Sequence, residues 1–101
     1  MELICFQLIT ASGGAKSSYI EAIQKAKLGL FDEAEALIAE GDKMMQQAHA
    51  PHTDLVQKEA AGENVLISLI LIHAEDQMMS TETFKIMAEE MIELYRKLLK
   101  P

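Results

Sequence analysis

The most constraining feature of the sequence is its C-terminal third, because neither glycine nor proline occurs over residues 65–99. Placed on a helix of 3.6 residues per turn, this segment divides into an apolar side and a charged side. A helix over the whole segment would be about 52 Å long, whereas a compact domain of about 100 residues has a radius of gyration of about 13 Å. The sequence therefore predicts an elongated molecule built on one long C-terminal helix.

Two helices are predicted before this segment. The first covers residues 2–28 and is followed by Gly29, which suits the left-handed position after a helix end. Asp32 and Glu35 fit the two ends of a capping box and so predict the start of the second helix, which closes at residues 61–64. Three helices with short connections predict an all-α, antiparallel three-helix bundle with up-down-up topology.

Both of these helices contain residues that helices disfavour. Gly13 and Gly14 cost a helix interior roughly 1 kcal/mol each relative to alanine. Their small neighbours favour close packing by another backbone over a kink. Pro51 removes a backbone hydrogen bond at a cost of about 3 kcal/mol. We therefore expect a kink or a short break over residues 48–53.

The chain of 101 residues is predicted to form one domain over residues 1–101. Its formal net charge of −7 argues against binding to nucleic acid or to an anionic membrane surface, since both require a basic surface. The longest apolar run, residues 65–72, is too short to span a bilayer, so no direct membrane insertion is expected.

The N-terminal residues and the single cysteine bear on the compartment. Glu2 stands where an export signal would be basic, and no lysine or arginine precedes Lys16. Cys5 has no second cysteine with which to form a disulfide, and its apolar neighbours suit a small buried side chain rather than a reactive thiol. We therefore expect a cytoplasmic protein.

An imidazole and a carboxylate lie three residues apart on the long C-terminal helix, at His73 and Asp76. On the helical wheel both fall on the main apolar side, whereas Glu75 falls on the opposite, charged side. An ionised carboxylate is costly to bury unless it is paired, hydrogen-bonded or bound to a metal. We therefore expect both side chains on the buried face, as candidate functional residues.

The first half of this helix is apolar on more than one side. The main apolar side carries Leu66, Leu69, Ile70, Phe84, Met87, Ala88, Met91, Leu94, Tyr95 and Leu98. Further apolar residues lie off that side, at Val65, Ile67, Leu71, Ile72, Met78 and Met79. A surplus of apolar surface predicts burial against another molecule. We expect self-association through this helix, most simply as a symmetric homo-oligomer.

Residue types alone leave the role of His73 open. A single histidine on an apolar face is more often a core residue than a nucleophile or proton carrier. His49 and His52 could join His73 in a zinc site, but the sequence has no HExxH motif, no Glu-x-x-His motif and no cysteine pair. A small metal-binding bundle therefore remains a weak alternative.

Several stretches of the sequence resemble one known family. Residues 73–81, followed by residues 92–95, resemble the active-site helix of the lactose/cellobiose-type enzyme IIA of the bacterial sugar phosphotransferase system. Residues 22–34 are similar to the first helical hairpin of that family, and residues 48–63 to the end of its second helix. The resemblance covers nearly the whole chain.

This resemblance implies a phosphocarrier that assembles as a homotrimer with nine helices. His73 matches the family's phosphoryl-accepting histidine, which would take a phosphoryl group from phosphorylated HPr and pass it to the cysteine of a cognate IIB protein or domain. The transfer would drive uptake and phosphorylation of a disaccharide of the lactose or cellobiose/chitobiose type. The main alternative is a non-catalytic helical interaction or regulatory module with the same fold.

The resemblance also implies a metal site. Asp76 matches the aspartate that each subunit of the family contributes to a divalent cation on the threefold axis, which we expect to be Mg²⁺. Two unit charges 4 Å apart repel by about 4 kcal/mol at an effective dielectric constant of about 20, so three converging carboxylates require a cation. Three carboxylate oxygens and three waters would complete the octahedron that Mg²⁺ prefers.

Two residues depart from the commonest pattern of the family. Glu75 replaces a glutamine found in many members and adds a negative charge, but the wheel places it about 160° from His73, so we expect little effect. Gln77 replaces a histidine that follows the aspartate in many members. Gln77 could at most donate a hydrogen bond to the phosphoryl group.

Overall fold

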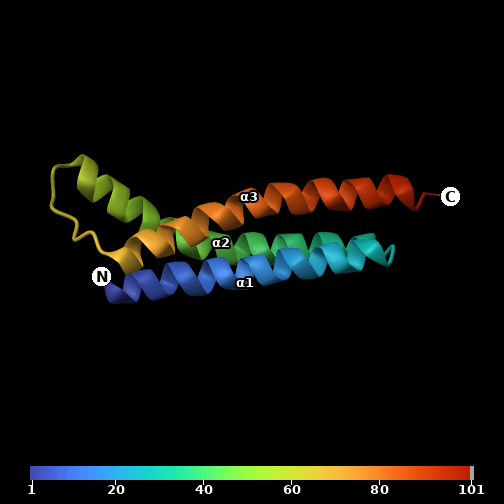
Figure 1. The fold of residues 1–101 in the computed structure, drawn as a ribbon, viewed down its shortest axis with the longest axis horizontal. Coiled ribbons are helices and arrows are strands. Elements are labelled where there is room, and N and C mark those ends of the chain that lie inside the picture. The colour runs from blue at the N-terminus through green and yellow to red at the C-terminus, as the bar shows by residue number, and fades with distance from the viewer. Residues whose placement is uncertain (101) are drawn as a thin grey trace.

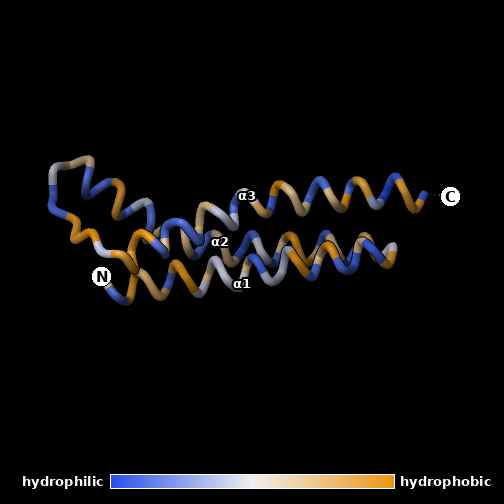
Figure 2. Tube along the Cα trace, in the orientation of Figure 1, coloured by the Kyte–Doolittle hydropathy of each residue, from blue (hydrophilic) through white to orange (hydrophobic). Residues whose placement is uncertain are grey.

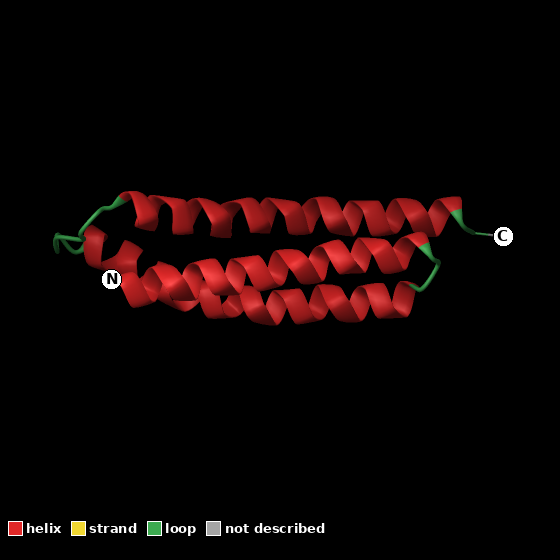
Figure 3. Ribbon diagram, turned by 60° about the horizontal axis from the view of Figure 1, so that its bottom comes forward, coloured by secondary structure: helices red, strands yellow, loops and turns green. Residues whose placement is uncertain are grey.

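The computed structural model describes residues 1–100, which form three helices: α1 (Glu2–Lys27), α2 (Phe31–Ala60) and α3 (Leu69–Leu98). Figure 1 shows α2 running back along α1, and α3 running in the same direction as α1. No strand occurs within residues 1–100 (Figure 3). The radius of gyration is 16.1 Å and the principal extents are 58 × 20 × 20 Å. The predicted all-α, elongated up-down-up bundle is confirmed.

The turn between α1 and α2 forms as the sequence predicts. Gly29 has a φ of 77°, which lies in the left-handed region that glycine tolerates without steric cost. The Gly29 N–H donates to the Ala26 carbonyl and the Leu30 N–H donates to the Lys25 carbonyl, each at 3.0 Å. These two bonds satisfy carbonyls that would otherwise be orphaned at the end of α1.

The predicted capping box at the start of α2 is wrong. The helix begins at Phe31, its N-cap position is Leu30, and no side chain caps it. The reason is that the glycine turn leads the chain directly into the helix, where the Ala34 N–H already donates to the Leu30 carbonyl at 3.0 Å. Asp32 therefore lies in the first helical turn, where a carboxylate still favours the helix dipole.

Pro51 lies inside α2 and does not interrupt it, so the break that the sequence allowed does not occur. Figure 1 shows instead that the C-terminal part of α2 diverges from the direction of its first part. A proline within a helix removes one backbone hydrogen bond and bends the helix away from the ring. The alternative expectation, a kink around residues 48–53, agrees with this shape.

The long C-terminal helix begins four residues later than predicted. Gly62, with a φ of 83°, ends α2 in the left-handed region, and residues 63–68 form a connection without regular structure. Ser68 then caps α3, because its hydroxyl oxygen accepts a hydrogen bond from the Leu71 N–H at 3.2 Å. Val65 and Ile67 therefore belong to the connection, which changes from hydrophilic to hydrophobic on its way to α3 in Figure 2, and not to the helix.

The core lies along α1, which contacts both α2 and α3, while α2 and α3 contact each other far less. Small side chains allow the helices to approach closely. Fully buried alanines occur on all three helices, at Ala15, Ala22, Ala26, Ala34, Ala48, Ala74 and Ala88. Tyr19 is the largest fully buried side chain. As expected, Cys5 is also buried.

Close packing against a glycine occurs at Gly41 rather than at Gly13 and Gly14. A Cβ added at Gly41 would lie 2.8 Å from Cδ1 of the Tyr19 ring, so this ring occupies the space that a side chain would fill. Nothing lies within 4 Å of a Cβ added at Gly13, and a Cβ at Gly14 would meet the Met44 side chain, with the sulfur at 3.0 Å, and no backbone of another helix. The expected backbone contact at Gly13 and Gly14 is therefore wrong.

Candidate functional site

His73 lies in the second turn of α3 and its side chain is exposed. Within residues 1–100 it forms no side-chain hydrogen bond and no ion pair. The other two histidines behave differently, because His49 and His52 each contact a glutamate of α3. Of the three histidines, His73 is thus the one with neither ring nitrogen engaged by a side chain of residues 1–100.

In the single chain, Asp76 is exposed like His73, so the prediction that both lie on the buried face is wrong. The side of α3 that packs into the bundle carries Leu71, Ala74, Met78, Thr81, Ala88 and Ile92. On the helical wheel this side is centred about 100° from His73. Since α3 is apolar on two sides, the wheel identified the apolar sides without showing which of them faces α1.

The second apolar side forms a continuous exposed stripe that includes His73 and Asp76. We call it the α3 stripe, and its apolar members are Leu69, Ile72, Met79, Met87, Leu94 and Leu98, each at least half exposed. Leu71 and Met78, which were expected to drive self-association, instead fill the core. A contiguous apolar surface of this kind marks an interaction site. Of the apolar residues predicted to lie off the main side, Ile72 and Met79 are therefore exposed on the α3 stripe, together with residues of the main apolar side.

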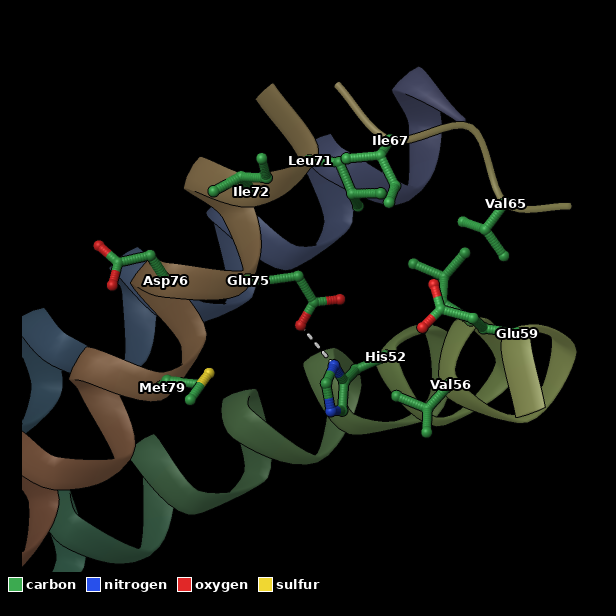
Figure 4. A pocket seen from close by; sticks show the side chains of 11 residues that line it. His52, Val56, Glu59, Val65, Ile67, Leu71, Ile72, Glu75, Asp76 and Met79 are labelled. Carbon is green, nitrogen blue, oxygen red and sulfur yellow. Dashed lines mark hydrogen bonds and ion pairs between the residues drawn. The ribbon is translucent and has the colours of Figure 1, made fainter. Parts of the chain in front are cut away.

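A groove of about 480 Å³ lies between the C-terminal part of α2 and the start of α3. Figure 4 shows Glu75 pointing across this groove to His52, while Asp76 points away from that pair, toward the α3 stripe. Apolar side chains make up most of the remaining wall, among them Leu55, Val56, Val65, Ile67, Ile72 and Met79. One edge of the groove is therefore shared with the turn that carries Asp76.

Two pairs of histidine and glutamate join α2 to α3 beside this groove. His52 Nδ1 contacts Glu75 Oε2, and His49 Nε2 lies 3.3 Å from Glu82 Oε1. The prediction that Glu75 lies on a solvated surface is wrong, because its side chain is only 23% exposed. Within residues 1–100 no three histidine, cysteine or carboxylate side chains lie close enough together to hold a metal ion.

A partly buried polar network connects all three helices further along the bundle. The Tyr19 hydroxyl donates to Asp42 Oδ1 at 2.7 Å, and the Lys85 ammonium donates to Asp42 Oδ2 at 3.1 Å. Burial raises the pKa of the Tyr19 phenol well above its usual value near 10, and the hydrogen bond to Asp42 and the negative charges of Asp42, Glu89 and Glu82 raise it further.

Sequence reasoning missed both sets of polar contacts. Each of them joins residues that are far apart in the chain, from 19 and 42 to 85 in one case and from 52 to 75 in the other. Their pairing depends on the register between helices, which a single sequence does not contain. The only signal was the pair of histidines three residues apart, which places both on one face of α2.

None of the helices within residues 1–100 has a stretch that is both long enough and apolar enough to cross a bilayer.

Residues 3–96 match the family model described as the lactose/cellobiose-specific IIA subunit of the PTS system. Among curated proteins, the chain is 44% identical over 95 residues to the oligo-beta-mannoside-specific EIIA component of Bacillus subtilis, a match that covers 94% of this chain and 86% of the relative.

Solved structures of IIA proteins resemble the fold over nearly its whole length. The PTS cellobiose-specific enzyme IIA from Bacillus anthracis is 44% identical with a TM-score of 0.94, covering 99% of this chain and 93% of that one. The chitobiose IIA of Escherichia coli, solved in complex with HPr, is 32% identical with a TM-score of 0.83, covering 96% and 94%.

Proposed function

The chain belongs to the lactose/cellobiose-specific IIA family of the phosphotransferase system, and from this membership we propose that His73 carries a phosphoryl group from phosphorylated HPr to the cysteine of a cognate IIB protein or domain. The observation that supports this role best is the environment of His73. Its ring is exposed on an apolar surface, whereas the two other histidines are engaged by glutamates.

The chemistry requires a neutral imidazole with an accessible ring nitrogen. A lone pair of that nitrogen attacks phosphorus, the new P–N bond forms, and the bond between phosphorus and the donor breaks. In the second step a cysteine thiolate of IIB attacks phosphorus and His73 leaves as neutral imidazole. The apolar side chains around His73 are exposed in the single chain, and their burial against another subunit or a partner would exclude water and so slow hydrolysis of the phosphoimidazole.

The α3 stripe suits a carrier that must bind two partners in turn, because exposed apolar surface can dock different proteins without fixed polar contacts. The structural relative solved with HPr supports HPr as the donor. The relatives described above are named for different sugars. We therefore assign the substrate as a disaccharide of the lactose or cellobiose/chitobiose type, without a choice between them.

We further assign the α3 stripe to a homotrimer in which Asp76 of each subunit holds one shared divalent cation, Mg²⁺. The carboxylate of Asp76 suits this ion, since Mg²⁺ prefers oxygen ligands. Asp76 stands exposed among apolar side chains, so a symmetric contact through the stripe would bring like charges together. The cation would neutralise them and so stabilise the assembly. The whole chain, residues 1–101, would form one cytoplasmic IIA domain.

The test is intact-mass spectrometry of the protein after incubation with enzyme I, HPr and phosphoenolpyruvate at neutral to alkaline pH. We expect a gain of one phosphoryl group, about 80 Da, that is lost on acid treatment and absent from His73→Ala. His49→Ala is the matched control and should gain the group like the wild type, because His49 is exposed and its ring nitrogen is paired with Glu82.

A wild-type protein that gains no mass beside a demonstrably active HPr would contradict the proposal. It would favour the non-catalytic interaction module, in which the α3 stripe binds a partner without phosphoryl transfer. A gain of mass that persists in His73→Ala would instead place the phosphoryl group on another residue.

A further inference from the structure

The two His–Glu pairs lie where α2 and α3 also share apolar contacts of the core, which include Leu55 and Leu71. Beyond Pro51 the axis of α2 diverges from α3, and the groove of about 480 Å³ lies between them. The pairs at His49 and His52 cross to α3 at Glu82 and Glu75. The order of the two pairs follows the antiparallel course of the helices, so that the residue further along α2, His52, meets the earlier residue of α3, Glu75.

The two pairs differ in burial. The side chains of His52 and Glu75 are 29% and 23% exposed, whereas those of His49 and Glu82 are 52% and 42% exposed. A hydrogen bond that is partly removed from water is stronger and better defined than one on the surface. An ionised carboxylate only accepts hydrogen bonds, so the ring nitrogen of His52 is the donor.

Glu75 lies between His73 and Asp76 in one turn of α3. Because a helical turn is rigid, holding the Glu75 side chain from α2 fixes the rotation of this turn about the helix axis. The directions of His73 and Asp76 then follow. Figure 4 shows this arrangement on one side, with Glu75 directed at His52 and Asp76 directed away from both.

We propose that His52 is a positioning residue for phosphoryl transfer, which acts by holding Glu75 and thereby the turn that carries His73 and Asp76. This inference rests on the proposed function of His73. The pair also keeps the Glu75 carboxylate directed into the groove.

The experiment compares single-turnover transfer from phosphorylated HPr to the wild type, His52→Ala and His49→Ala. We expect the maximal rate to fall about tenfold in His52→Ala, because displacement of reacting groups by a fraction of an ångström has effects of that order. The concentration of phosphorylated HPr at half-maximal rate should change little. His49→Ala should transfer at the wild-type rate.

Two further variants separate positioning from general loss of stability. In His52→Gln the side-chain amide can still donate to Glu75, so the rate should recover to within about threefold of the wild type. In a Glu75→Ala background, His52→Ala should not lower the transfer rate further, because the proposal has His52 act through the Glu75 side chain, which is then absent. Circular dichroism and size-exclusion chromatography check that each variant keeps its fold and assembly.

Equal rates for His52→Ala and the wild type would overturn the inference while leaving the proposed function intact. So would a tenfold loss that His52→Gln fails to restore, or one that persists unchanged in the Glu75→Ala background. A wild-type protein that accepts no phosphoryl group would instead overturn the proposed function itself.

Discussion

At the scale of single residues, the network of Tyr19, Asp42 and Lys85 shows how the bundle includes polar groups in an interior built largely from alanine. The Tyr19 ring is fully buried and fills the space left by Gly41. Its hydroxyl would be costly to bury alone, but it donates to Asp42, whose other oxygen is engaged by Lys85. Each member of the network belongs to a different helix, so it also fixes their relative register.

The raised pKa of Tyr19 predicts a loss of stability at alkaline pH. Below about pH 9 the phenol is neutral in both the folded and the unfolded chain and has no effect. As the pH rises through 10, the unfolded chain releases the proton while the folded chain retains it. The free energy of unfolding should then fall by up to about 1.4 kcal/mol per pH unit from this group.

Tyr19→Phe tests this expectation by urea unfolding at pH 8 and pH 11. The variant should lose about 1 kcal/mol at pH 8, because the hydrogen bond to Asp42 is removed. It should also lose less stability than the wild type between the two pH values. Parallel losses in both proteins would show that Tyr19 ionises in the folded state, contrary to its buried position.

At the scale of helices, the sequence predicts the number and order of the helices better than it predicts the residues at which they begin. Three helices and their order follow from apolar periodicity, from Gly29 and from the helix end predicted at residues 61–64. The structure confirms the left-handed backbone predicted for Gly29 and also places Gly62 in that region. The starts of α2 and α3 were both misplaced, because a start depends on which backbone groups the preceding turn already satisfies. Asp32 has a side chain that can cap a helix, but it lies inside the first turn of α2. Ser68 caps α3, but the apolar residues before it led the sequence analysis to place the helix start at residue 65.

Glycines inside the helices provide a prediction with its own control. Gly13→Ala should stabilise the protein by about 0.5 to 1 kcal/mol, because alanine favours the helix and the added Cβ meets nothing within 4 Å. Gly41→Ala gains the same helix propensity, but its Cβ would overlap the buried Tyr19 ring, so a net destabilisation of about 1 to 2 kcal/mol is expected.

Thermal unfolding at one protein concentration checks both variants. Since the assembly state affects the midpoint, the concentration must be the same for the two variants and the wild type. A stabilised Gly41→Ala would mean that the Tyr19 ring moves aside at little cost, and that the close approach at Gly41 is not a constraint on the fold.

At the scale of the whole molecule, the candidate site could be predicted only in part. The interruption of an apolar helix by His73 and Asp76 is visible in the sequence, and the structure brings both onto the α3 stripe. Their exposure in the single chain was not predicted, because either apolar side of α3 could pack against α1. The side with the small residues Ala74 and Ala88 does so, and His73 and Asp76 lie on the other. The link from His52 to Glu75 was also not foreseen, since it depends on the course of α2 after Pro51.

Asp76→Leu tests the proposed assembly, because it exchanges the charge on the α3 stripe for an apolar side chain. Removing like charges that would converge on the axis also removes the need for a cation, so the variant should still form a trimer but bind no divalent metal. Light scattering coupled to chromatography measures the assembly, and elemental analysis after dialysis against Mg²⁺ measures the metal, with one ion per wild-type trimer expected.

Asp54→Leu is the matched control, since Asp54 is an exposed aspartate of α2 that pairs with Lys58 away from the stripe, and it should keep both properties. A monomeric Asp76→Leu would mean that the cation, and not the apolar stripe, holds the subunits together, whereas metal retained by its trimer would move the cation site to other residues.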